Sequence, residues 1–324
     1  MPPSGPCEMM ARISYESVDT LIYDPVASNR AATRSALLTL GFRRIETVAS
    51  IDALNDHLQR RPPDLAICEV SGVQDPLCGT IQEVRQGLSA YNPFLVVIVT
   101  AWGNAGSLVG NVINSGADDL LLRPFSTATL EARIRTQVER RKGFVITSDY
   151  VGPDRRRSSH RAGPTELLQP PNSLKMKAKE RVAEDVVAER LNRELKAARE
   201  ILTTEKLRRE AFQICVLWRL MQGGVPQAEA QYEVDLIRLA EVTRNLSRRA
   251  RDTDFEEAVV WCDKVLGAIE GLQLGVDRNA SMHLLGHAAL NLMRLFSPEK
   301  SAEERLNELD ATVAMIRSRQ ALAS

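Results

Sequence analysis

The sequence predicts a doubly wound α/β domain with a parallel five-stranded sheet, followed by a long helix and an all-α bundle. Between residues 19 and 142, short β-branched runs alternate with helical patterns, which is typical of a parallel sheet covered on both faces. Beyond about residue 174, strand patterns stop and apolar residues recur at helical spacing. A length of 324 residues also favours about two domains over one compact core.

The first domain is expected to contain five strands, preceded by a flexible N-terminus over residues 1–18. The strands are Thr20–Tyr23, Ile45–Val48, Leu65–Cys68, Phe94–Val99 and Leu120–Leu122. Helices are expected over residues 29–40, 51–59 and 127–141, with Gly41 suited to end the first and Ser50 to cap the second. Because parallel sheets bind ligands at the carboxyl ends of their strands, the residues just after each strand are the candidate site.

Residues 143–174 are rich in Gly, Pro, Ser and Arg, and no apolar periodicity runs through them. Proline fixes φ and lacks an N–H, so the prolines there interrupt any long helix. We therefore predict a linker. The run Arg155–Arg157 could contact phosphates, but a solvated charge run is the simpler interpretation.

A long helix or coiled coil is expected over residues 175–222. Its apolar residues fall in two near-heptad series with a shift of register between them: Val187, Leu191, Leu195, Ala198 and Leu202, then Leu207, Ala211, Ile214, Trp218 and Met221. This stripe predicts a homodimer, although helices of the same chain could cover it instead.

An α-helical bundle is expected over residues 225–324. Its helices are predicted at Gln227–Arg251, Phe255–Leu272, Arg278–Phe296 and Pro298–Ala321, with Ser297 as the N-cap of the last. Apolar stripes at helical spacing in this region predict a bundle core.

Charge and composition narrow the classes of function. The 42 basic residues balance 42 acidic ones, and residues 175–324 carry 24 of each, which disfavours a nucleic-acid partner. The longest wholly apolar run of the first domain, Phe94–Val99, is far shorter than the roughly 20 residues that cross a membrane, and no secretory segment is seen before the first predicted strand, so we expect a cytoplasmic protein without a membrane partner. The five cysteines are scattered, with no C-x-x-C, which argues against a disulfide framework or a zinc site.

Four segments of the first domain carry a family resemblance. The runs L-I-Y-D-P, P-D-L-A-I-C-E-V, V-I-V-T-A and G-A-D-D-L-L-L-R-P-F together resemble the receiver domain of two-component response regulators, over about residues 19–142. The resemblance implies a flavodoxin-like fold. It also implies a pocket in which paired acids hold Mg²⁺, an Asp accepts a phosphoryl group, and a hydroxyl and a Lys bind the new phosphate.

This chain departs from that pattern at several positions. Asp24 matches the first acid, but Pro25 stands where the second should be, and Glu69 occupies the acceptor position. Thr100 matches the hydroxyl, Arg123 replaces the Lys, and Leu120 stands where the family often has an aromatic switch residue. The departures imply a degenerate receiver without a cofactor, since Mg²⁺ lacks a ligand at Pro25. Glu69 and Arg123 are expected to pair across the pocket, with a bidentate fork as one geometry.

Two histidines of the helical half, His283 and His287, are spaced i, i+4. The spacing suits a metal pair or a phosphotransfer histidine. However, no suitable Glu or Cys accompanies them, and no Lys adjoins them, although Gly286 follows His283 by three residues. We expect packed or surface histidines and no metal site.

The sequence as a whole favours an atypical response regulator that is not an enzyme and acts through protein contacts in phosphorelay signal transduction. Its expected partner is a histidine kinase or another signalling protein. Two alternatives remain: a nucleic-acid-binding transcriptional or antitermination regulator, for which Arg248, Arg249 and Arg251 form the dense basic cluster, and a helical-bundle histidine phosphotransfer protein.

Overall fold

The computed structural model describes residues 13–71, 76–87, 91–103, 106–155, 167–179, 184–222, 229–251, 253–275 and 277–321, and every structural statement below concerns these ranges. The chain forms two compact units, residues 1–202 and residues 203–324. The boundary falls within one helix, α7 (Glu184–Met221), rather than at the end of the expected linker.

The first unit contains the predicted five-stranded parallel sheet. Its strands, β1 (Asp19–Tyr23), β2 (Arg44–Val48), β3 (Leu65–Val70), β4 (Val96–Trp102) and β5 (Asp119–Arg123), lie in the order β2-β1-β3-β4-β5. Every residue of β3 is buried, as expected for a central strand covered on both faces. The doubly wound fold class is therefore confirmed.

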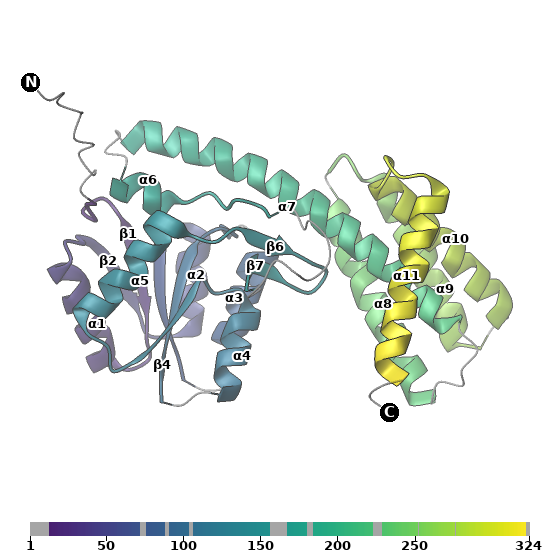
Figure 1. Ribbon diagram of the computed structural model, residues 1–324, viewed down its shortest axis with the longest axis horizontal. Helices are drawn as coiled ribbons and strands as arrows, with labels where there is room; N and C mark the ends of the chain where they lie inside the picture. Colours follow the sequence, from purple (N-terminus) through teal and green to yellow (C-terminus); the bar gives the residue numbers. More distant parts are fainter. Residues whose placement is uncertain are drawn as a thin grey trace, which may run out of the picture. The chain divides into compact units, whose positions relative to one another are not determined.

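Helices cover the two faces of the sheet in two layers (Figure 1). Apolar residues of α1 (Ala27–Thr39) and α5 (Thr127–Arg140) share a core with Ile22, while α2 (Ile51–Arg60), α3 (Leu77–Gln86) and α4 (Gly106–Ser115) share the opposite core with Leu21. The predicted caps are present. Ser50 accepts a hydrogen bond from the backbone N–H of Ala53, and Gly41 follows α1 with a φ of +99°.

The linker prediction is wrong for much of residues 143–174. A hairpin forms there from β6 (Phe144–Ile146) and β7 (Val151–Pro153), Phe144 also pairs with Leu168, and α6 (Ser173–Lys179) follows. Strands of three residues are too short to show the alternation of apolar and polar residues that marks a strand, and the residues that pack on them lie far away in the sequence. The composition of the segment therefore suggested a linker where the chain forms strands. Residues 156–166, including Arg156 and Arg157, lie outside the described part, whereas Arg155 donates to the carbonyl oxygens of Ala117 and Asp118.

A buried charge cluster joins this hairpin to the sheet. Asp118 accepts hydrogen bonds from Arg85 Nη2 and from Arg141 Nε, each at 2.8 Å. Both guanidinium groups also lie 5.1 Å from the ring centre of Phe144 in β6. Burial lowers the pKa of Arg85 to about 10, against the opposing effect of Asp118. Because its members come from α3, from the residue before β5, from the residue after α5 and from β6, the cluster makes the hairpin part of the first unit.

The apolar stripe of the first part of α7 is covered within its own unit. Leu195, Ala198 and Leu202 pack with Phe94 and Phe144 in one hydrophobic cluster. Of the single helix expected over residues 175–222, the structure describes α6 up to Lys179 and α7 from Glu184, and residues 180–183 lie outside the described ranges. The homodimer was expected because this stripe would need a second chain to cover it. In the structure, residues of the same chain cover these side chains, so this part of α7 gives no reason to expect a dimer.

The second unit is helical, as predicted. It contains the rest of α7 with α8 (Glu229–Ala250), α9 (Glu257–Gln273), α10 (Arg278–Phe296) and α11 (Ala302–Ala321), around one apolar core. The last helix begins later than expected, because Ser301 rather than Ser297 caps it, accepting from the N–H of Glu304 at 3.1 Å. Gly286 allows α10 to approach α7 closely, since a Cβ there would overlap the Trp218 ring. No helix in the described ranges is long and apolar enough to cross a membrane.

Candidate functional site: a buried cluster of Arg123, Glu69 and Asp24

Four side chains predicted from the sequence lie at the carboxyl edge of the sheet. Asp24 follows β1, Glu69 lies near the end of β3 and pairs in register with Thr100 of β4, and Arg123 ends β5. Parallel strands end at one common edge, so four strands deliver these residues to one place. The side chain of Arg123 is only 7% exposed, and Asp24, Glu69 and Thr100 are buried.

Arg123 is the centre of this cluster. Its Nε donates to Glu69 Oε2 at 2.7 Å, and its Nη2 donates to Thr33 Oγ1 at 3.0 Å and to Asp24 Oδ2 at 3.3 Å. The Thr100 hydroxyl donates to the same Glu69 oxygen. The structure therefore brings the four predicted residues together and adds Thr33. The guanidinium bridges two carboxylates instead of forming a bidentate fork with Glu69 alone.

Asp24 is fully engaged at this edge. Its Oδ1 accepts from the backbone N–H of Val26 at 2.8 Å, while Oδ2 faces Arg123. Arg30 donates to the carbonyl oxygens of Asp24 and Pro25, at 2.6 and 3.0 Å, and so ties the first turn of α1 to the loop. Pro25 contributes no carboxylate, and the loop is held by backbone contacts.

These residues do not fit a Mg²⁺ ion. Magnesium needs near-octahedral oxygen coordination, usually with one or two carboxylates. Glu69 Oε1 is the one carboxylate oxygen of this cluster without a hydrogen-bond partner among the described residues. The Arg123 charge already occupies the space between the two acids and would repel a cation. Within the described ranges, no group of three His, Cys, Asp or Glu side chains could hold a metal ion.

The remaining sequence candidates lie elsewhere. Leu120 is half-buried against the core beneath α2, α3 and α4, and it contributes no polar group. His283 and His287 are exposed on α10 in the second unit, where the His287 ring meets Trp261 edge-on at 5.6 Å. The two histidines are therefore not core residues, and phosphotransfer stays a prediction of the sequence alone.

One member of the basic cluster Arg248, Arg249 and Arg251 does not belong to an exposed face. Arg249 is buried, and its Nε lies 3.5 Å from Glu210 Oε2, whereas Arg248 is exposed and donates to Asn245. Burial is the largest influence on both partners: it lowers the pKa of Arg249 and raises the pKa of Glu210. This arginine is part of the helical core.

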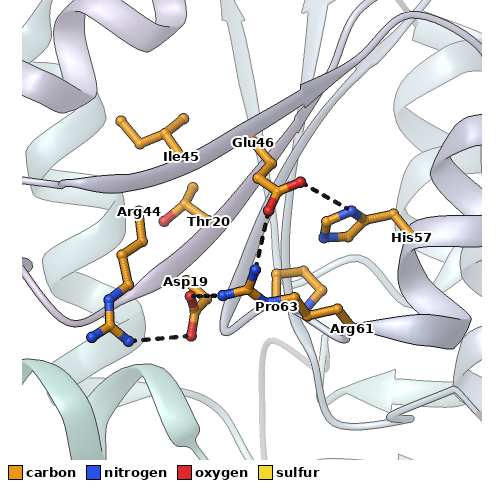
Figure 2. A pocket seen from close by; sticks show the side chains of 8 residues that line it. All are labelled: Asp19, Thr20, Arg44, Ile45, Glu46, His57, Arg61 and Pro63. Carbon is orange, nitrogen blue, oxygen red and sulfur yellow. Dashed lines mark hydrogen bonds and ion pairs between the residues drawn. The ribbon is translucent and has the colours of Figure 1, made fainter.

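A separate cavity of about 290 Å³ lies at the opposite edge of the sheet, where the strands begin. Figure 2 shows Arg61 between Asp19 and Glu46, at 3.4 and 3.3 Å, with His57 3.6 Å from the other oxygen of Glu46. The charges of the cavity therefore pair largely with one another. Sequence reasoning missed this cavity and also the cluster around Asp118. Asp118 lies within the recognised G-A-D-D run, but nothing in the sequence marks Arg85 as its partner.

Comparison with known proteins supports the interpretation of the first unit. The chain is 30% identical over 128 residues to "Probable transcriptional regulator ycf27" of Guillardia theta, covering 40% of this chain and 48% of that protein. It is 36% identical over 91 residues to the two-component response regulator PhoP of Pseudomonas aeruginosa, covering 28% and 36%. The phosphate regulon transcriptional regulatory protein PhoB of Rhizobium meliloti is 29% identical over 139 residues, covering 38% and 58%. The chain thus spans between about a third and three fifths of the length of these relatives.

Solved structures are also similar to this chain. A signal receiver domain from Clostridium thermocellum matches 38% of this chain and 98% of its own, at 15% identity and a TM-score of 0.34. The chemotaxis response regulator CheY4 of Vibrio cholerae matches 36% and 96%, at 20% identity and a TM-score of 0.32. No family model matches the chain. The strand order and the similarity to curated response regulators together identify the five-stranded sheet with the helices that cover it as a response-regulator receiver domain.

Proposed function

We propose that this protein is an atypical response regulator that works in two-component signal transduction through protein contacts, without aspartate phosphorylation. It is not an enzyme in this proposal, and it needs no Mg²⁺. Its partner is a signalling protein such as a histidine kinase, which recognises the receiver surface in one fixed state. The similarity to curated two-component regulators supports the signalling role.

One observation supports the proposal that this pocket is not phosphorylated: the Arg123 guanidinium binds Glu69 and Asp24 at the same time. A phosphoryl group would need a free acceptor carboxylate, a cation beside it and a positive side chain to receive its charge. In this pocket the acceptor position holds a longer carboxylate, which is already bound to Arg123 and Thr100. In this proposal the contacts of Arg123 with Glu69 and Asp24 take the place of the metal ion and the phosphoryl group.

Intact-mass measurement after incubation with acetyl phosphate and Mg²⁺ tests this proposal. We expect no mass gain for the wild-type chain, because neither the acceptor nor the metal ligands are available. The matched control carries Pro25→Asp, Glu69→Asp and Arg123→Lys together, which restores the residue types of the family pattern, and it should gain one phosphoryl group. A Mg²⁺-dependent gain on the wild-type chain, mapped to Glu69, would contradict the proposal.

A further inference from the structure

A groove of about 600 Å³ lies between α8 and α9 in the helical unit. Ile237 and Arg244 line it from α8, and Asp263, Gly267 and Glu270 line it from α9. Ile237 is 62% exposed, and Val234, one turn before it on α8, is 55% exposed. Large apolar side chains with this exposure, beside a concave surface, are typical of protein contact sites.

Gly267 lines this groove and leaves open space above the backbone of α9. It lies inside α9, where glycine is about 1 kcal/mol less favourable than alanine. Its φ is not in the left-handed region, and a Cβ built on it would meet no atom within 4 Å. Neither backbone conformation nor packing within the described residues therefore requires a glycine here. Gly286 in the neighbouring α10 differs, because the Trp218 ring fills the space beside it.

The walls of the groove carry opposite charges that do not pair within the described residues. The basic wall is formed by Arg244 on α8, and the acidic wall by Asp263 and Glu270 on α9. All three side chains are exposed, and none of them forms an ion pair with another described residue. Asp263, Gly267 and Glu270 follow one another at spacings of four and three residues, so they lie along one side of α9.

We propose that this groove is the interface between two copies of the chain. A two-fold contact uses the same patch on both subunits, so such a patch must be complementary to itself. A groove with one basic wall and one acidic wall meets this condition, since Arg244 of each copy can face Asp263 and Glu270 of the other. Ile237 of each copy would enter the open space over Gly267 of the other.

Charge reversal tests the proposal on the full chain. Sedimentation velocity at tens of micromolar should show a dimer for the wild-type protein. Arg244→Glu should weaken the dimer at least about tenfold, because like charges then face each other twice across the two-fold axis. The double variant Asp263→Lys with Glu270→Lys should dissociate for the same reason.

The mixture of these two variants is the decisive measurement. Both contacts then join opposite charges, so an equimolar mixture should recover the dimer that neither variant forms alone. Arg209→Glu, an exposed arginine on α7 outside the groove, is the matched control and should leave the dimer intact. Circular dichroism would show that every variant keeps its helices. The proposal would be overturned if the wild-type protein were monomeric, if the charge-reversal variants dimerised as well as the wild type, or if the mixture of the two variants stayed monomeric.

Discussion

Replacement of Asp118 by Ala should lower the free energy of unfolding of the receiver unit by about 3–5 kcal/mol, because it leaves two buried guanidinium groups without their carboxylate. Arg85 is 1% exposed in its side chain and Arg141 is 4% exposed, so water cannot replace Asp118. Urea denaturation of the wild type and the variant measures the difference. The hairpin β6–β7 should separate from the sheet in the variant, since its Phe144 ring packs against both arginines.

Asp119 provides the matched control for this experiment. It is the next residue, and its carboxylate lies 3.4 Å from Arg133, an arginine with a side chain 49% exposed. Asp119→Ala removes this ion pair and the hydrogen bond that Asp119 Oδ1 accepts from the N–H of Leu120, so stability should fall by about 1–2 kcal/mol. Burial would raise the pKa of Asp118, but Arg141, Arg85 and hydrogen bonds hold it below its ordinary value. Its stabilisation should thus be present at neutral pH and disappear as the pH falls through the lowered pKa. Equal losses of stability for Asp118→Ala and Asp119→Ala would contradict the role assigned to Asp118.

Replacement of Arg123 by Ala should have an effect of similar size, about 3–5 kcal/mol, because Glu69 and Asp24 would become two buried like charges without a cation. Arg123→Lys should lower stability less, since an ammonium group keeps the charge but cannot reach both acids with a planar fork. Thermal and urea unfolding of the three proteins measure this order.

Arg133→Ala is the control for Arg123, because Arg133 lies on α5, its side chain is 49% exposed, and its one ion pair among the described residues is with Asp119. It should change stability by about 0–1 kcal/mol. If Arg123→Ala were as mild as Arg133→Ala, the carboxyl-edge cluster would not be held by this guanidinium.

Much of the first unit could be predicted because its signals are local. Each strand is a short β-branched run, and the residue after it falls at the carboxyl edge, so the sequence alone places Asp24, Glu69, Thr100 and Arg123 together. Thr33 could not be expected in the cluster, because it lies on the second turn of α1 and nothing in its neighbourhood marks it as a ligand of Arg123.

The region after α5 was harder to predict, for a physical reason. Phe144 and Val151 lie in strands of three residues and gain their stability from Phe94, Arg85 and Leu202, which are distant in the sequence. Composition there is dominated by Gly, Pro and Arg, which suggests a linker wherever such long-range contacts are not known. The apolar stripe of α7 was recognised, but periodicity cannot tell whether a second chain or the same chain covers it.

Thermal unfolding with and without Mg²⁺ tests the central claim most directly, namely that Arg123 holds the place of the metal between Asp24 and Glu69. A site with a Kd of about 1 mM would add about 1.4 kcal/mol of stability at about 10 mM Mg²⁺. We predict that MgCl2, compared with NaCl at equal ionic strength, leaves the Tm of the wild-type protein unchanged. It should raise the Tm of the variant that combines Pro25→Asp, Glu69→Asp and Arg123→Lys. A saturable, Mg²⁺-specific rise in the Tm of the wild-type protein that Asp24→Ala abolishes would contradict the account.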